Sequence, residues 1–403
     1  MELRRPSRRS TSVKHTTLEN MPTNENSLQG DLIQILKLVS IDFFQIKIIL
    51  LYLKLVVVIT LLLELTQTYL FLQKFEILFL IQYGPSYIVT LFFLLSAFTV
   101  PYTTQLITKT FDHIKYWDVE NVDPKVVKRI RKEAHRVNLF FVLYLILPAT
   151  SSILHVIPDP DDVSMFYYFM IIENYFPIGG KFLSWCFRCN FLMICLIMLT
   201  PYTQLLYCCK CWKFQTLLLQ SALERIEYDF KGNDDLIIVP EVQSEVKRKL
   251  ISCVKLYINL QTGCLSMVKR IKYLILIYAT VGCWLIISLI FFRIYFQEIC
   301  SGKYPRSIAA VSSTLIMAIC GIYTGQDLED SSSRIFDLLK TLSWYRWNEE
   351  NRKIYLMFTI VCQKPLRIEF SENMIVGYSL GAEVARTVYS MVSILMQIKY
   401  FGN

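Results

Sequence analysis

Seven apolar segments, each about as long as a helix that crosses a lipid bilayer, dominate this sequence. They lie at residues 47–65, 76–102, 136–157, 176–207, 273–295, 307–323 and 375–400. Because a helix rises about 1.5 Å per residue, about 20 apolar residues are enough to cross the hydrocarbon core. With 54% of the 403 residues hydrophobic, the composition is typical of a polytopic membrane protein and not of a soluble enzyme. The predicted fold class is an all-α membrane protein with seven transmembrane helices.

The basic residues are unevenly distributed, and their distribution predicts the orientation of the chain. Lysine and arginine are dense after the second, fourth and sixth spans, whereas residues 158–175 contain neither. Since cytosolic loops carry the excess of Lys and Arg, we expect a cytosolic N-terminus and an extracellular C-terminus. The net charge of +9 is then a topology signal, and nucleic acid is not an expected partner. The predicted organisation is a cytosolic N-terminal segment (1–46), transmembrane helices one to four (47–207), a cytosolic helical anchor (208–272), transmembrane helices five and six (273–325), a cytosolic anchor helix and turn (326–374) and the last transmembrane helix (375–403).

Motifs for catalysis, metals and cofactors are missing from the sequence. There is no HExxH, Walker loop, GxGxxG or nucleophile elbow, and the chain has only 4 histidines. We therefore expect no enzyme activity, no metal and no cofactor. The 12 cysteines are scattered without an extracellular framework, so free thiols are expected. Cys208, Cys209 and Cys211, at the predicted inner membrane edge, are candidates either for palmitoylation or for unmodified thiols.

The last span combines membrane length with a polar face. At 100° per residue this face carries Ser379, Glu383, Arg386, Thr387, Ser390 and Gln397. A charge at mid-membrane costs about 2.5 to 3.5 kcal/mol on insertion scales, so this face must contact protein or water. Near the outer end the stripe is interrupted by Ile394 and, one turn later, by Ile398. A water-filled groove that closes on a ring of aliphatic side chains gates by dewetting, so these two residues are the predicted gate of a pore.

A single helix cannot enclose a pore, so the pore interpretation requires several subunits. In a second interpretation, the polar stripe packs against other helices of the same chain. Glu383 and Arg386, three residues apart, could then simply pair with each other.

A candidate ligand pocket lies where four spans carry aromatic and small polar groups in their outer halves. Each of these residues alone is commonly explained by helix packing, but together they suit a small, mostly apolar molecule with one hydrogen-bonding group. The candidates are Tyr83, Ser86 and Tyr87 of span two, Ser151 and His155 of span three, Phe182, Cys186 and Asn190 of span four, and Ser312, Ser313 and Ile316 of span six.

The C-terminal third resembles the insect odorant receptor family. The similarity rests on Ser343-Trp344-Tyr345, Arg352-Lys353, Gln363-Lys364-Pro365-Leu366 and the ending Thr387-Val388-Tyr389-Ser390 to Gln397. The layout of seven spans with a long cytosolic extension after span four is similar along the whole chain. Residues 367–374 depart from the family pattern, in which a Gly-Phe-Pro-like turn is more common.

This resemblance implies a function and partners. It implies a ligand-gated, non-selective cation channel in which an odorant-binding subunit forms a heterotetramer with the shared odorant co-receptor (Orco). A small volatile hydrophobic odorant, membrane lipid and permeating cations are then the other partners, and the plasma membrane of an olfactory sensory neuron dendrite is the expected location. The resemblance also implies that residues 210–272 and 331–366 form the subunit anchor, that the last helix lines the pore with Ile394 and Ile398 at the gate, and that spans two, three, four and six hold the odorant.

Three other classes remain as alternatives. A gustatory receptor-type channel shares the ending but usually works without the co-receptor. A membrane transporter would show internal repeats and paired broken helices, and we find no repeat. A G-protein-coupled receptor requires the opposite orientation of the chain.

Overall fold

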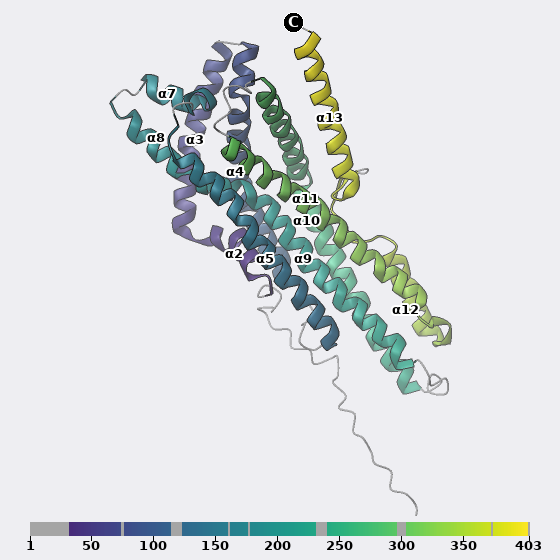
Figure 1. The fold of residues 1–403 in the computed structure, drawn as a ribbon. Coiled ribbons are helices and arrows are strands. Elements are labelled where there is room, and N and C mark those ends of the chain that lie inside the picture. Colours follow the sequence, from purple (N-terminus) through teal and green to yellow (C-terminus); the bar gives the residue numbers. More distant parts are fainter. Residues whose placement is uncertain are drawn as a thin grey trace, which may run out of the picture.

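The computed structural model describes residues 32–73, 76–113, 123–159, 162–175, 178–230, 240–295, 304–371 and 374–401. Nearly all of this part of the chain is helical, and the long helices before the last one run side by side in one bundle (Figure 1). Its long helices are α3 (Lys47–Gln73), α4 (Ile77–His113), α5 (Pro124–Val156), α9 (Phe191–Phe230), α10 (Pro240–Tyr295), α11 (Tyr304–Thr341) and α13 (Tyr378–Phe401). The first 31 residues of the predicted N-terminal segment lie outside the described ranges.

The described residues contain 6 helical stretches that are long and apolar enough to cross a membrane. They are α3, α4, α5, the stretch formed by α8 (Gly180–Cys189) and α9, α10, and α11. The last helix, α13, has 24 residues, so it is about 36 Å long and long enough for a seventh span. Its charged residues lower its hydropathy, as the sequence predicted.

Short elements connect the long helices. The helix α2 (Gln34–Ser40) and the turn η2 (Asp42–Gln45) precede α3, and α6 (Asp162–Met165) and α7 (Tyr167–Tyr175) lie between α5 and α8. Between α11 and α13 are η4 (Trp344–Arg346), α12 (Glu349–Cys362) and the strands β1 (Glu369–Ser371) and β2 (Met374–Ile375). The two strands pair antiparallel, with Glu369 opposite Ile375.

Local sequence explains two of the helix starts. Asp123 precedes α5, and its carboxylate accepts a hydrogen bond of 2.9 Å from the backbone N–H of Lys125, with Pro124 at the first helical position. Asn348 caps α12 in the same way, because its side chain accepts from the N–H of Asn351 at 2.9 Å. Both caps lie outside the apolar spans predicted from the sequence.

The largest buried core surrounds the second half of α9, in the lower part of the bundle in Figure 1. Trp212, Phe214 and Leu218 of α9 are fully buried there, together with Tyr257 of α10 and Phe358 of α12. The rings of Tyr257 and Phe358 pack edge to face with their centroids 6.0 Å apart. By contrast, only 6% of the most apolar stretch of α10 is buried. The apolar spans therefore leave much of their surface for lipid or neighbouring subunits.

The Gln363-Lys364-Pro365-Leu366 turn is tied to two helices. The hydroxyl of Tyr257 in α10 donates a hydrogen bond of 2.9 Å to the carbonyl of Lys364. The N–H of Leu366 donates to the hydroxyl of Ser332 in α11, also at 2.9 Å. These bonds fix the chain between α12 and the strand pair that leads into α13.

A buried network of charges joins α5, α9 and α11. The ammonium of Lys210 lies 2.9 Å from Glu133 and 2.7 Å from Asp327. The ammonium of Lys213 lies 2.7 Å from Glu133 and 2.9 Å from Asp327, so each lysine contacts both carboxylates. Because the pairing is reciprocal, none of the four charges is buried alone.

Two expectations need correction. Span four, expected as one helix over 176–207, is two helices, α8 and α9, that break at Asn190; residues 176–177 are not described. At the break, the side-chain amide of Asn190 donates to the carbonyl of Cys186, and its backbone N–H donates to the carbonyl of Phe187. The segment before the last span, expected to be helical and cytosolic, contains the β1–β2 pair and is not helical throughout; its location stays a prediction. The side chains of Cys208, Cys209 and Cys211 are buried in the core, which favours unmodified thiols over palmitoylation, the two alternatives that the sequence left open.

The helices α9 and α10 each continue without interruption far past their apolar parts, as the predicted extension of spans four and five requires. That these extensions lie beyond the membrane stays a prediction. The acidic loop expected between them lies outside the described residues. The boundaries of the predicted segments along these continuous helices stay a prediction.

Candidate functional site

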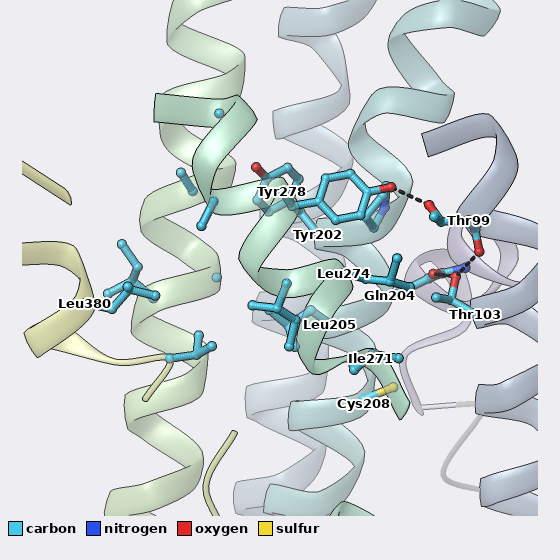
Figure 2. A pocket seen from close by; sticks show the side chains of 18 of the residues that line it. Thr99, Thr103, Tyr202, Gln204, Leu205, Cys208, Ile271, Leu274, Tyr278 and Leu380 are labelled. Atoms are coloured by element: carbon cyan, nitrogen blue, oxygen red, sulfur yellow. Dashed lines mark hydrogen bonds between the residues drawn. The ribbon is translucent and has the colours of Figure 1, made fainter. Parts of the chain in front are cut away.

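A cavity of about 190 Å³ lies between α4, α9, α10 and α11 and reaches the start of α13. Figure 2 shows its lining side chains. Most of the wall is aliphatic: Leu106 and Ile107 of α4, Leu205 of α9, Met267, Ile271, Leu274, Ile275 and Ile286 of α10, and Ile322 of α11 contribute to it. A site of this kind suits an apolar molecule, because the wall offers few groups to replace the hydrogen bonds of water.

Polar side chains occupy one wall of the cavity, and most of them are paired with each other (Figure 2). The hydroxyls of Thr99 and Tyr278 lie 2.5 Å apart and so link α4 to α10. Thr103 donates a hydrogen bond of 2.6 Å to the side-chain carbonyl of Gln204. The amide nitrogen of Gln204 in turn donates to the hydroxyl of Thr104 and to the carbonyl of Ser40.

The hydroxyl of Tyr202 differs from these groups. Among the described residues it has no hydrogen-bond partner, although its ring stacks on Phe92 at 6.4 Å. A Cβ added at Gly282 would lie 3.7 Å from this hydroxyl, and one added at Gly321 would lie 4.0 Å from the Tyr202 ring. The two glycines therefore leave open space around Tyr202 within the cavity.

The root of α13 forms part of the same cavity. Val376, Leu380 and Val384 line it, and Leu380 is labelled in Figure 2. Just before α13, the N–H of Val376 donates to the carbonyl of Ile368 at 2.9 Å, which holds this segment against the start of β1. A molecule that fills the cavity would contact α13, the helix that the sequence predicts to line a pore.

The outer part of α13 stands apart from the bundle (Figure 1). Glu383, Arg386, Ser390 and Gln397 of the predicted pore face are all exposed. Ile394 is 50% exposed, and the side chain of Ile398 lies outside the described part of the structure.

The second interpretation of this stripe therefore has no support within the chain. The polar stripe does not pack against other helices of the same chain, and among the described ion pairs none joins Glu383 to Arg386. The roles of these residues in a pore stay a prediction.

The residues predicted to form the outer ligand pocket do not line this cavity. Several of them lie in two aromatic clusters. In the first, the ring of Tyr83 packs 5.0 Å from Tyr167 of α7, and the hydroxyl of Tyr87 lies 3.1 Å from that of Thr68 in α3. Ser86 donates to the carbonyl of Tyr83 and is buried. The helix α7 thus covers this part of α4.

The second cluster surrounds His155 near the end of α5. The imidazole stacks on Phe191 at 5.1 Å, and its Nδ1 lies 2.7 Å from the carbonyl of Ser151. A buried ion pair covers this cluster, because the guanidinium of Arg188 in α8 contacts Asp162 at 2.6 Å and donates to the carbonyl of His155.

The remaining candidates are not gathered into one pocket. Phe182 is 76% exposed, and Cys186 is also exposed. Asn190 accepts a hydrogen bond from Tyr52 of α3 and lies at the break between α8 and α9. In α11, the carbonyl of Ser313 accepts from Tyr144 at 3.0 Å, Ser312 bonds its own helix, and Ile316 packs on the main core. Ligand binding at all these positions stays a prediction.

Sequence reasoning missed the cavity. It placed the pocket in the outer halves of spans two, three, four and six. The cavity is instead lined by later residues of α4 and α9 and by α10, which held no candidate. A usable signal was present, because Thr99, Thr103, Gln204 and Tyr278 are polar residues inside or at the inner end of apolar spans.

Comparisons with known proteins agree with this architecture. The model of the family described as 7tm Odorant receptor matches residues 76–382, which is more than half of the chain. Odorant receptor 22c of Drosophila melanogaster is 22% identical over 152 residues, which cover 38% of this chain and only 36% of that protein.

Two solved structures have a similar fold. The insect olfactory receptor OR5 from Machilis hrabei in complex with eugenol has a TM-score of 0.61 and 11% sequence identity, covering 92% of this chain and 97% of that one. The structure of the same receptor described without eugenol also has a TM-score of 0.61, with 10% identity over the same shares of both chains. At this level of identity the likeness shows the fold alone.

Proposed function

This chain belongs to the seven-transmembrane odorant receptor family, and we propose that it is the odorant-binding subunit of a heteromeric, odorant-gated, non-selective cation channel. The observation that carries the proposal is the exposed polar face of α13. A helix of membrane length with Glu383 and Arg386 exposed is costly in lipid but suits a water-filled pore shared between subunits.

The proposed partner is the shared odorant co-receptor (Orco), in a heterotetramer. Two features support assembly. The outer part of α13 contacts little of its own chain, and α12 presents an apolar surface in which Leu356, Met357 and Ile360 are exposed. Apolar side chains that remain exposed together on one helix are typical of a subunit interface. We place the assembly in the plasma membrane of an olfactory sensory neuron dendrite.

The proposed ligand is a small, volatile, mostly apolar odorant. We retain the outer residues around Tyr83, Tyr87, Ser151 and His155 as its site, since the described aromatic clusters offer apolar contact with a few polar groups. The solved structure of the receptor OR5 in complex with eugenol is compatible with such a ligand class. Shifting a channel from about 1% to about 99% open needs about 5.5 kcal/mol of differential affinity, so a small odorant should act with modest potency.

Whole-cell currents test the proposal. Cells expressing this chain with an insect odorant co-receptor should give a rapid cation current on exposure to a panel of volatile esters, terpenes and alcohols, and the current should persist when G proteins are blocked. Cells expressing the chain alone should be silent. Currents from the chain alone would favour the homomeric, gustatory receptor-type channel, and currents that vanish with G-protein blockade would overturn the channel proposal.

A further inference from the structure

The cavity at the root of α13 lies apart from the outer residues proposed for the odorant. We propose that it is a second binding site, which takes a small apolar molecule carrying one hydrogen-bond acceptor and which changes gating through α13. This inference rests on the proposed channel function. It assigns a separate ligand site and a route by which its occupant acts.

The size of the cavity sets the size of its ligand. An apolar protein cavity of about 150 Å³ admits benzene, so the 190 Å³ cavity here has room for one ring or a short alkyl chain. Against an aliphatic wall, each methylene added to the ligand should tighten its binding about fourfold until the cavity is filled. The ligand is therefore expected to be smaller than most drug molecules.

The polar wall sets the chemistry of the ligand. Thr99 is already hydrogen-bonded to Tyr278, and Thr103 to Gln204. The hydroxyl of Tyr202 has no partner among the described residues and lies beside the open space at Gly282. A hydroxyl in this position can donate to a ketone, ester or ether oxygen, and this bond would orient the ligand.

The cavity is connected to the proposed gate through α13. The occupant would contact α10 and α11 on one side and Leu380 and Val384 of α13 on the other. If α13 moves relative to α10 and α11 when the pore opens, these contacts differ between the closed and open states. A ligand shifts a conformational equilibrium by its difference in affinity for the two states, so occupancy should alter the response to odorant.

Two native thiols allow the site to be probed directly, because Cys283 and Cys208 both line the cavity. Cys283 is half-buried and Cys208 is buried, so Cys283 should react first with hexyl methanethiosulfonate. In the purified complex with the co-receptor, 2-heptanone should slow the modification of Cys283 at least about threefold, as measured by mass spectrometry.

Substitutions distinguish the contribution of the cavity's shape to ligand binding from the contribution of the proposed hydrogen bond. Tyr202→Phe should weaken protection by 2-heptanone but leave protection by its alkene analogue, 2-methyl-1-heptene, unchanged. Ala279→Leu should fill the cavity and remove protection by both compounds. Thr280→Leu is the matched control, because Thr280 is the exposed neighbour of Ala279 on the same helix, and it should behave as the unsubstituted protein.

Currents then test the effect on gating. Treatment with the hexyl reagent should shift the odorant concentration for half-maximal current at least about threefold, and the double substitution Cys208→Ser, Cys283→Ser should remove this shift. If the unsubstituted channel gives no odorant current, the proposed function fails, while the protection assay still measures binding. If odorant currents are normal but 2-heptanone gives no protection, or confirmed labelling of Cys283 leaves the currents unchanged, the second site is overturned. A lipid that co-purifies with the unsubstituted protein and is lost from Ala279→Leu would show a resident acyl chain and overturn the small-molecule assignment.

Discussion

Gly325 of α11 and Val376, two residues before α13, approach so closely that a Cβ on Gly325 would stand 2.2 Å from the carbonyl oxygen of Val376. The obstructing atom is backbone, so no rotation of a side chain can relieve the contact. Only glycine fits at position 325 in this arrangement. The segment that leads into α13 is thereby packed directly on α11, next to the cavity.

Gly325→Ala should therefore displace the start of α13. Overpacking at such a contact typically costs about 1 to 3 kcal/mol, and the displaced helix should alter odorant-evoked current even where the protein reaches the surface. Thermal stability of the detergent-solubilised complex and whole-cell current measure the two effects. Gly84→Ala is the matched control, since a Cβ there meets nothing within 4 Å. Equal behaviour of the two variants would contradict the close contact.

The charge network predicts a large effect for Lys210→Met. This change leaves Glu133 and Asp327 with Lys213 as their remaining cation in the network, in a region where the Lys210 side chain is 7% exposed. Breaking a buried pair by removing one partner costs about 3 to 5 kcal/mol. The melting temperature of the complex should fall, and adding Asp327→Leu should recover part of the loss.

A surface lysine provides the control for this prediction. Lys340 pairs with Asp337 three residues away, but both side chains are more than half exposed. Lys340→Met should therefore change stability by less than about 1 kcal/mol. If Lys210→Met were as mild as Lys340→Met, the four-charge network would not be formed in solution.

Cys362 in α12 should resist alkylation. Burial raises the pKa of its thiol, so the reactive thiolate is scarce at pH 7 to 8 and becomes appreciable only at higher pH. Leu356→Cys places a thiol on the exposed face of the same helix, where Leu356 is 51% exposed, and should react rapidly with N-ethylmaleimide. Mass spectrometry of the folded protein compares the two sites. Similar rates would show that α12 does not pack on α10 as described.

The sequence was sufficient to predict the elements with strong hydropathy and charge signals. The long spans, the helical extension after span four and the two-faced last helix all follow from composition along the chain. The break at Asn190 was not predicted, because it depends on how the side chain of Asn190 bonds to the carbonyl of Cys186, which the hydropathy of the span does not specify. The polar residues inside the spans gave a signal for the cavity, but its shape could not be predicted, since it depends on how Gly282 and Gly321 from two different helices meet around Tyr202.

The orientation of the chain gives a prediction that is independent of conductance. A short epitope added after Asn403 should be stained on intact cells, and one added before Met1 only after permeabilisation, because the basic segments follow spans two, four and six. Flow cytometry with and without detergent provides the measurement. Staining of the N-terminal epitope on intact cells would instead match a G-protein-coupled receptor and would reverse the positions assigned to the anchor and the outer pocket.

The role proposed for Ile394 as a gate gives the last prediction. This side chain is 50% exposed on the part of α13 that stands apart from the bundle, where the side chains of neighbouring subunits would complete a ring. A narrow aliphatic ring excludes water, and a hydroxyl lowers the cost of wetting it, so Ile394→Ser should raise the current without odorant by about threefold or more. Ile394→Phe, which keeps the ring apolar, should leave that current low. Ile319→Ser makes the same chemical change on α11, where Ile319 is 55% exposed, and should not alter the basal current. Basal currents that are equal in all three variants, at matched surface expression, would remove Ile394 from the gate.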